Sequence, residues 1–174
     1  FPGQGSQKPG MGKDLVEAFP AARDALAAAD EALGESLSSL CFAGPADTLT
    51  LTANAQPALL THVAAAWAVV REALAGKVRA AAGHSLGEFT AYHAAGALTL
   101  PAAVRLVRER GRLMAETGVT RPGAMAAILG DMSESVDEIC RRASAAPDGG
   151  EVVPANYNCP GQVVISGEVA GVEA

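Results

Sequence analysis

The stretch AAAGHSLGEFT, residues 80–90, decides how this chain folds. A short apolar run leads into Gly83-His84-Ser85-Leu86-Gly87, and a helical pattern begins directly behind it. G-x-S-x-G between a strand and a helix is typical of a nucleophile elbow, a sharp turn that strains the serine backbone and exposes its hydroxyl. Glycines suit positions 83 and 87 because side chains there would collide across the turn. We therefore predict a strand over residues 77–82 and a nucleophilic Ser85. The alternative is a serine in an ordinary glycine-rich turn.

The composition limits the class of protein. The chain has 174 residues, 49% of them hydrophobic, which suits one domain or one domain and part of another. A net charge of −6 argues against a nucleic-acid partner. The three cysteines have no C-x-x-C spacing, so buried thiols in the reducing cytoplasm are expected, without a metal site. No apolar run approaches the ~18 residues of a membrane span, and no signal peptide precedes Phe1. The opening on FPGQGSQ, without Met, suggests that residues are missing upstream.

Apolar periodicity predicts helices on both sides of the elbow. The first main helix should start at Pro20 and stop at Gly34. A long, buried helix is expected over residues 56–75, with Pro57 in its first turn. Residues 1–12 are a glycine-rich loop, which suits a flexible tail as well as a ligand-facing segment around Gln4. Gln56, at the entry of the long helix, could reach the same site.

A helix over residues 100–117 carries the second informative residue. Most of its charged residues, Arg108 among them, gather on one face, as a solvated face should. Arg110 instead falls within the apolar arc, and an unpaired buried guanidinium is costly, so it needs an anionic partner. A purely structural explanation is that Arg110 forms an internal salt bridge, or that its side chain snorkels to the surface. The functional reading is a fork that binds a substrate carboxylate.

None of the three histidines makes a good general base for Ser85. His84 points away if its segment is a strand-to-helix turn, and His93 lies about two helical turns further on. His62, on the long helix, is most simply a packed histidine.

The pattern changes beyond residue 119. Residues 124–129, 152–155 and 162–166 read as strands, with a helix capped by Ser133 after the first and another helix starting at Glu168. This β-α-β-β-α order is that of a ferredoxin-like unit lacking its last strand. We therefore predict an α/β protein with a large α/β subdomain over residues 1–119 and a partial ferredoxin-like subdomain over residues 120–174.

Several motifs together carry a resemblance that no single one carries. FPGQGSQ, QPALL, GHSLGEFTA, RERGRLM, GAMAAILG and NYNCPGQVVISG follow one another along essentially the whole chain. In this order they resemble the malonyl-CoA:acyl carrier protein transacylases and the related acyltransferase domains of polyketide synthases. The resemblance implies an α/β-hydrolase-like large subdomain with a ferredoxin-like insert, both incomplete in this chain.

The resemblance also implies a mechanism, in fatty acid or polyketide synthesis. Ser85 would take the malonyl group from coenzyme A and pass it to the phosphopantetheine thiol of acyl carrier protein. The backbone N–H groups of Gln4 and Leu86 would form the oxyanion hole, and Arg110 would pair with the malonyl carboxylate. The family's general-base histidine would lie downstream of Ala174. No cofactor or metal is implied, and a cytoplasmic monomer without membrane or nucleic-acid partners is expected.

Two other functions stay open at this point. Lipases and esterases share the elbow, so a serine esterase or thioesterase is one alternative. Arg110 argues against it, because an apolar acyl pocket has no use for a buried cation. The other is an inert fragment that docks carrier protein, which would form no covalent acyl adduct.

Overall fold

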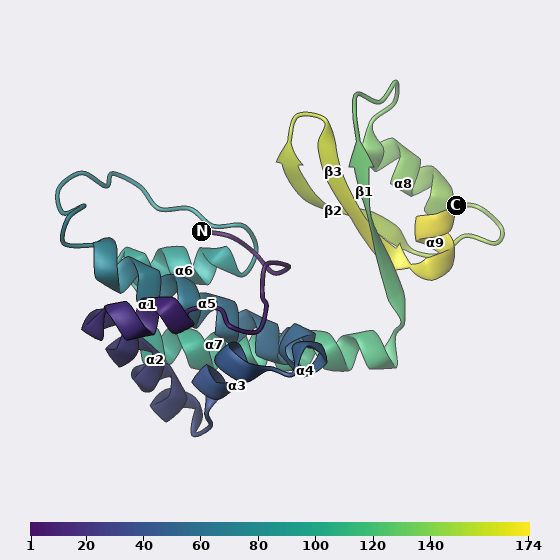
Figure 1. Ribbon diagram of the computed structural model, residues 1–174. Helices are drawn as coiled ribbons and strands as arrows, with labels where there is room; N and C mark the ends of the chain where they lie inside the picture. Colours follow the sequence, from purple (N-terminus) through teal and green to yellow (C-terminus); the bar gives the residue numbers. More distant parts are fainter. The chain divides into compact units, whose positions relative to one another are not determined.

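The computed structural model describes residues 1–174 as an α/β protein of nine helices and three strands (Figure 1). The chain divides into two compact units, Phe1–Ala115 and Glu116–Ala174. Helix α7 (Leu100–Thr120) runs through this division. The boundary predicted from the sequence, between residues 119 and 120, lies near the end of the same helix.

The first unit is helical. Its elements before α7 are α1 (Lys13–Ala18), α2 (Pro20–Leu33), α3 (Leu37–Ala43), α4 (Ala46–Thr50), α5 (Thr52–Val70) and α6 (Gly87–Ala94). Helix α2 starts and stops where the sequence predicted, with Pro20 in its first turn and Gly34 as a left-handed cap. Helix α5 buries residues along most of its length, and fourteen buried residues from α5 and from the loops and helices around it form one core. This core packs against the segment that carries Ser85, because Leu86 is part of it.

The strand predicted over residues 77–82 is wrong. These residues follow α5 as a turn and an irregular, exposed segment with no strand. The segment forms a single backbone hydrogen bond with another segment, from Phe1 N to Ala82 O (2.7 Å), and just after it the His84 N–H donates to Phe1 O (3.1 Å). A strand requires a neighbour along its length to pair its backbone groups, and apolar composition alone does not supply one.

The long helix also differs from the prediction. Helix α5 begins at Thr52, four residues earlier than expected, so Pro57 lies inside the helix instead of in its first turn. Proline has no N–H and cannot bond the carbonyl four residues before it, which here belongs to Ala53. Arg108 of α7 bonds this carbonyl instead (2.7 Å). The helix can therefore continue through Pro57.

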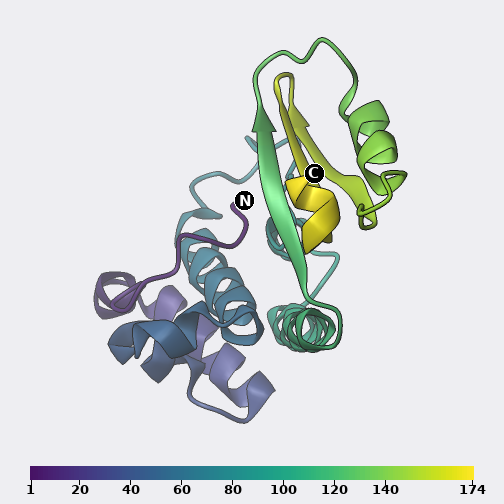
Figure 2. The same cartoon turned by 90° about the vertical axis from the view of Figure 1, so that its right-hand side faces the viewer.

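The second unit has the predicted order of elements after α7: β1 (Gly123–Leu129), α8 (Val136–Ser144), β2 (Val152–Cys159), β3 (Gln162–Glu168) and α9 (Val169–Glu173). The strands form an antiparallel sheet in the order β1-β3-β2 (Figure 2). Residues of β1 alternate between exposed and half-buried, as expected for a sheet covered on one side. The buried face packs on α8 and α9 through a small core around Cys140, Val152 and Ile165.

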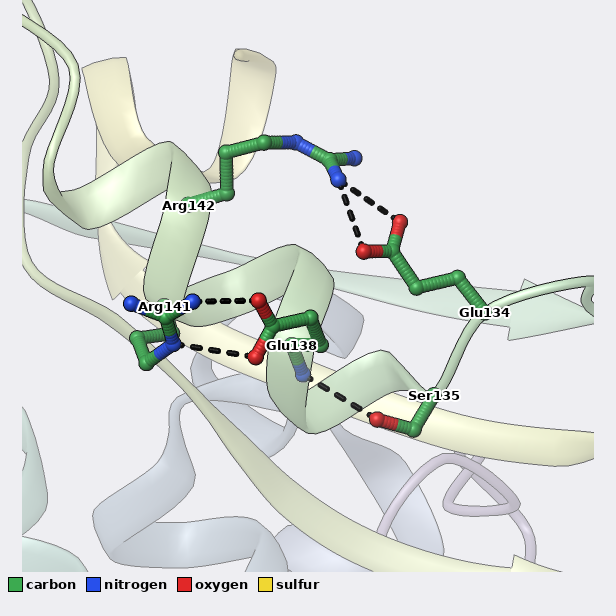
Figure 3. A network of polar contacts seen from close by, with 5 residues as sticks. All are labelled: Glu134, Ser135, Glu138, Arg141 and Arg142. Atoms are coloured by element: carbon green, nitrogen blue, oxygen red, sulfur yellow. Dashed lines mark hydrogen bonds and ion pairs between the residues drawn. The ribbon is translucent and has the colours of Figure 1, made fainter.

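Two local details of this unit correct the sequence interpretation. The cap of α8 is Ser135, not Ser133: its hydroxyl accepts a hydrogen bond from the Glu138 N–H (3.3 Å; Figure 3). Two arginines of the last turn of α8 form ion pairs with glutamates near its start: Arg141 with Glu138, and Arg142 with Glu134 (Figure 3). In addition, β2 continues through residues 156–159, which the sequence suggested as a loop, because β3 pairs with it up to the turn.

Candidate active site

Ser85 lies in a strained turn at the start of α6. Its φ is +51°, and it is the one non-glycine residue of the chain with positive φ. A side chain at Gly83 would put its Cβ 1.9 Å from the Gly87 carbonyl carbon, and a Cβ at Gly87 would lie 2.2 Å from the Phe1 carbonyl oxygen. Both positions therefore require glycine. Ser85 itself is exposed, so the turn presents its hydroxyl to solvent as a nucleophile elbow does.

The backbone around Ser85 offers hydrogen-bond donors. Helix α6 starts directly behind the serine, with Leu86 as its N-cap residue. N–H groups at a helix start have no partner within the helix. The bonds from Gly87 and Glu88 close the turn onto the carbonyls of His84 and Ser85. The turn is thus compatible with the predicted use of the Leu86 N–H for an oxyanion.

Arg110 reaches Ser85 from helix α7. One terminal nitrogen of its guanidinium donates to Ser85 Oγ (3.0 Å), and the other donates to Gln56 Oε1 (2.6 Å). The guanidinium carbon also lies 5.8 Å from the centre of the Phe89 ring, within the range of a cation–π contact. The partner of this half-buried cation is thus a neutral amide and the serine, not a carboxylate of the chain. An anionic ligand at Ser85 would find this cation unneutralised.

Gln56 and Gln4 are linked to this pair through a threonine. Gln56 is fully buried, and its Nε2 donates to Thr52 Oγ1 (3.1 Å) and to Met114 Sδ (3.3 Å). The Thr52 hydroxyl in turn donates to Gln4 Oε1 (2.8 Å). A continuous chain of polar contacts therefore runs from the first loop to the serine. We refer to it as the polar relay, formed by Gln4, Thr52, Gln56, Arg110 and Ser85.

Arg108 supports the relay and was misassigned from the sequence. It was expected on the solvated face of its helix, yet it is half-buried, and burial lowers the pKa of its guanidinium. Besides the Ala53 carbonyl it bonds Asn54 Oδ1 (2.5 Å) and forms an ion pair with Glu35. These contacts hold the first turn of α5, which carries Thr52. The sequence signal for this arrangement is Pro57, the sixth residue of α5, because it leaves the Ala53 carbonyl in need of another donor.

The histidines have other surroundings. His93 Nδ1 contacts the Leu98 carbonyl oxygen (3.1 Å), and His84 lies against Gly3, at which a Cβ would be 2.8 Å from the ring nitrogen Nδ1. His62 lines a separate open pocket of about 730 Å³ together with Met11, Gly12 and charged residues of the first loop and α1. The hydrogen bond to the Ser85 hydroxyl comes from Arg110.

The structure has no group of three or more His, Cys, Asp or Glu side chains placed to hold a metal ion. None of its helices combines the length and the apolar character that crossing a bilayer demands.

Comparison with known proteins places the whole chain in one family. The model of the acyl transferase domain matches residues 1–174. The malonyl CoA-acyl carrier protein transacylase of Bacillus subtilis is 50% identical over 173 residues, which cover 99% of this chain and 54% of that protein. The enzyme of the same name from Escherichia coli K12 is 44% identical over 174 residues, 99% of this chain and 55% of that protein. The chain therefore spans about half the length of the curated relatives it matches.

Solved structures agree with these relatives. An acyl carrier protein S-malonyltransferase from Vibrio cholerae superposes with a TM-score of 0.89 at 41% identity, covering 99% of this chain and 56% of that one. A malonyl-transacylase in complex with a type II polyketide synthase acyl carrier protein superposes with a TM-score of 0.86 at 44% identity, covering 99% of this chain and 55% of that one.

Proposed function

The chain belongs to the acyl transferase domain family, and on this premise we propose that the protein transfers malonyl groups from coenzyme A to acyl carrier protein. The observation that carries the proposal is the 3.0 Å contact between Arg110 and Ser85 Oγ. A cation beside a nucleophile suits an acyl group that ends in a carboxylate. An esterase for apolar acyl groups would gain nothing from it.

The transfer proceeds in two displacement steps. Ser85 Oγ attacks the malonyl thioester carbonyl and loses its proton to a general base, and coenzyme A leaves as the thiol after taking up that proton. The phosphopantetheine thiol of the carrier protein then gives its proton to the base and attacks the malonyl-serine ester, and the Ser85 oxygen leaves and takes up that proton. Backbone N–H groups of Leu86 and Gln4 stabilise the oxyanion of each tetrahedral intermediate. Arg110 binds the malonyl carboxylate throughout.

The remaining parts of the proposal follow from the family resemblance. The general base is a residue downstream of Ala174, and no step is assigned to His62, His84 or His93. No cofactor is needed apart from the phosphopantetheine of the partner. The enzyme acts in fatty acid or polyketide synthesis as a cytoplasmic monomer, without a membrane or nucleic-acid partner.

The proposed architecture is an α/β-hydrolase-like subdomain followed by a ferredoxin-like one. The positive φ of Ser85 and the backbone bonds of Phe1 with residues 82 and 84 support the first. The sheet order β1-β3-β2 with both helices on one face supports the second.

The intact mass of the protein after brief exposure to malonyl-CoA tests the proposed function. We expect a malonyl-sized gain that the Ser85→Ala variant lacks, because the acyl group is held on that hydroxyl. Acetyl-CoA serves as the matched donor. In Arg110→Ala, malonyl loading should fall by about ten- to a hundredfold, the worth of a charge-assisted hydrogen bond, with acetyl loading changed far less.

Each alternative predicts a different pattern. An esterase would lose both acyl groups equally in Arg110→Ala, and a docking fragment would gain no mass from either donor. A gain that persists in Ser85→Ala would place the nucleophile elsewhere and overturn the mechanism.

A further inference from the structure

The Thr52 hydroxyl is the single group that joins the two glutamines of the polar relay. It lies 2.8 Å from Gln4 Oε1 and 3.1 Å from Gln56 Nε2. Gln4 belongs to the first loop, whereas Gln56 lies one helical turn after Thr52 on α5. Thr52 is therefore placed between the loop on one side and the residue that binds Arg110 on the other.

The chemistry of a hydroxyl determines how both amides are oriented. A threonine hydroxyl has one hydrogen to donate, and here it goes to the Gln4 carbonyl oxygen. Toward Gln56 the oxygen can then only accept, so the NH₂ end of Gln56 must face Thr52. This leaves the oxygen end of Gln56 toward Arg110, where it accepts a 2.6 Å hydrogen bond. With the amide reversed, two donors would meet at Arg110.

Thr52 is itself held on its backbone side. Helix α7 approaches so closely at Gly111 that a Cβ there would lie 2.7 Å from the Thr52 carbonyl oxygen. Three residues before Gly111, Arg108 bonds the carbonyl of Ala53. The backbone that carries the hydroxyl is thus clamped by the same helix that carries Arg110.

We propose that Thr52 is a positioning residue that couples the Gln4 loop to Arg110, so that the oxyanion donor and the carboxylate-binding cation are set together. The inference rests on the proposed function and adds to it a residue that touches neither substrate nor Ser85. Its consequence is specificity: loss of the hydroxyl leaves the NH₂ end of Gln56 with Met114 Sδ as its remaining acceptor, so Gln56 holds Arg110 less firmly, and the acyl group that needs Arg110 suffers most.

The test is the Thr52→Val variant, which keeps the shape of the side chain and removes the hydroxyl. We expect malonyl loading of the protein to fall about tenfold and acetyl loading about threefold, the range of one or two neutral hydrogen bonds. The malonyl-to-acetyl ratio therefore drops. Thr52→Ser, which restores the hydroxyl, should recover both rates. An unchanged ratio in Thr52→Val would overturn the coupling to Arg110.

Thr61→Val is the matched control on the same helix. Thr61 is buried and its hydroxyl has no hydrogen-bond partner, so the change removes an equal group without breaking a contact. It should load both acyl groups as the wild type does. If Thr61→Val shifts the ratio as far as Thr52→Val, the effect comes from repacking of α5, and the relay has no special role.

Amide hydrogen exchange tests the loop side of the relay without any reaction. Exchange of residues 3–7 should be faster in Thr52→Val than in the wild type and in Thr61→Val, because the loop loses its tie to α5. Equal exchange in all three would refute that tie. A wild-type protein that takes up no malonyl group would count against the proposed function, and the exchange measurement would still decide whether Thr52 holds the loop.

Discussion

At the scale of single residues, the site is assembled by hydrogen bonds between neutral groups and one cation. The guanidinium of Arg110 carries five N–H donors, and its contacts with Gln56 and Ser85 use two of them. The neutral partners orient the cation without cancelling its charge. A carboxylate partner from the chain would have satisfied Arg110 equally well, but it would have left the site without attraction for an anionic acyl group.

His62 leads to a prediction of pH dependence. Burial lowers the pKa of its imidazole from 6.5, although Asp14 acts to raise it, and its buried Nδ1 has no hydrogen-bond partner. Lys8, Lys13 and Glu17 line the same pocket. Because the folded protein binds the proton less readily than the unfolded chain, the free energy of unfolding should fall as the pH drops below about 6.5. The loss ends below the lowered pKa of the folded state, where both states are protonated.

Urea unfolding at several pH values between 5 and 8 measures how the free energy of unfolding depends on pH. The His62→Gln variant is the control, because it keeps a polar side chain and cannot titrate. Subtracting its profile removes the contribution of the carboxylates, and the difference should slope downward on acidification. A flat difference between the two proteins would show that His62 titrates alike in the folded and the unfolded chain.

Residues of the site differ in how far a sequence can reveal them. Arg110 could be found because a cation within an apolar arc is anomalous on any helical wheel. Gln56 was suggested by its place near a helix start. Thr52 gives no such signal, since a threonine near a helix terminus is common and its role depends on which side chains from other segments meet it. The relay is a product of tertiary contacts.

At the scale of elements, α5 depends on its neighbour α7. Pro57 leaves the Ala53 carbonyl without its helical partner, and Arg108 supplies the missing donor. The Arg108→Met variant should therefore lower the free energy of unfolding by about 1–3 kcal/mol, the usual effect of leaving a buried polar group unpaired. Arg112→Met is the control on the same helix. Its ion pair with Glu109 is exposed to solvent, so its loss should change the free energy of unfolding much less.

A second change tests the cause of that loss. Pro57→Ala restores an N–H that can donate to Ala53, so Arg108→Met should cost less in this background. Urea unfolding of the four proteins completes the cycle. Additive losses would mean that Arg108 stabilises the helix through Asn54 and Glu35 alone, and that the proline is not the reason for its burial.

The elements themselves could be predicted where local chemistry decides them. Pro20 and Gly34 mark the ends of α2 because their backbone preferences operate within a few residues. The strand predicted over residues 77–82 was wrong because local chemistry does not decide a strand. A strand exists only when another segment pairs with it. The early start of α5 could not be predicted from the sequence either, because the internal proline is tolerated through a contact with Arg108, which lies far along the chain.

At the scale of the whole molecule, each of the two units has its own core, and the cores differ in size. The main core of the first unit contains fourteen buried residues, including Cys41, whereas that of the second contains three, including Cys140. The third thiol, Cys159, is exposed at the end of β2. Each core thus holds one cysteine, and the surface holds another. Thiol reactivity can therefore report on the two units separately.

Alkylation by iodoacetamide at pH 8 should modify Cys159 alone in the native protein. Burial raises the pKa of the Cys41 thiol to about 11, with Asp30 adding to the shift, and burial also raises the pKa of Cys140, so neither is reactive as a thiolate. The native Cys159→Ser variant should remain unlabelled. With increasing urea, Cys140 should react before Cys41, because the smaller core buries less apolar surface. Mass analysis of digested samples identifies the order, and earlier labelling of Cys41 would mean that core size does not govern the stability of the two units.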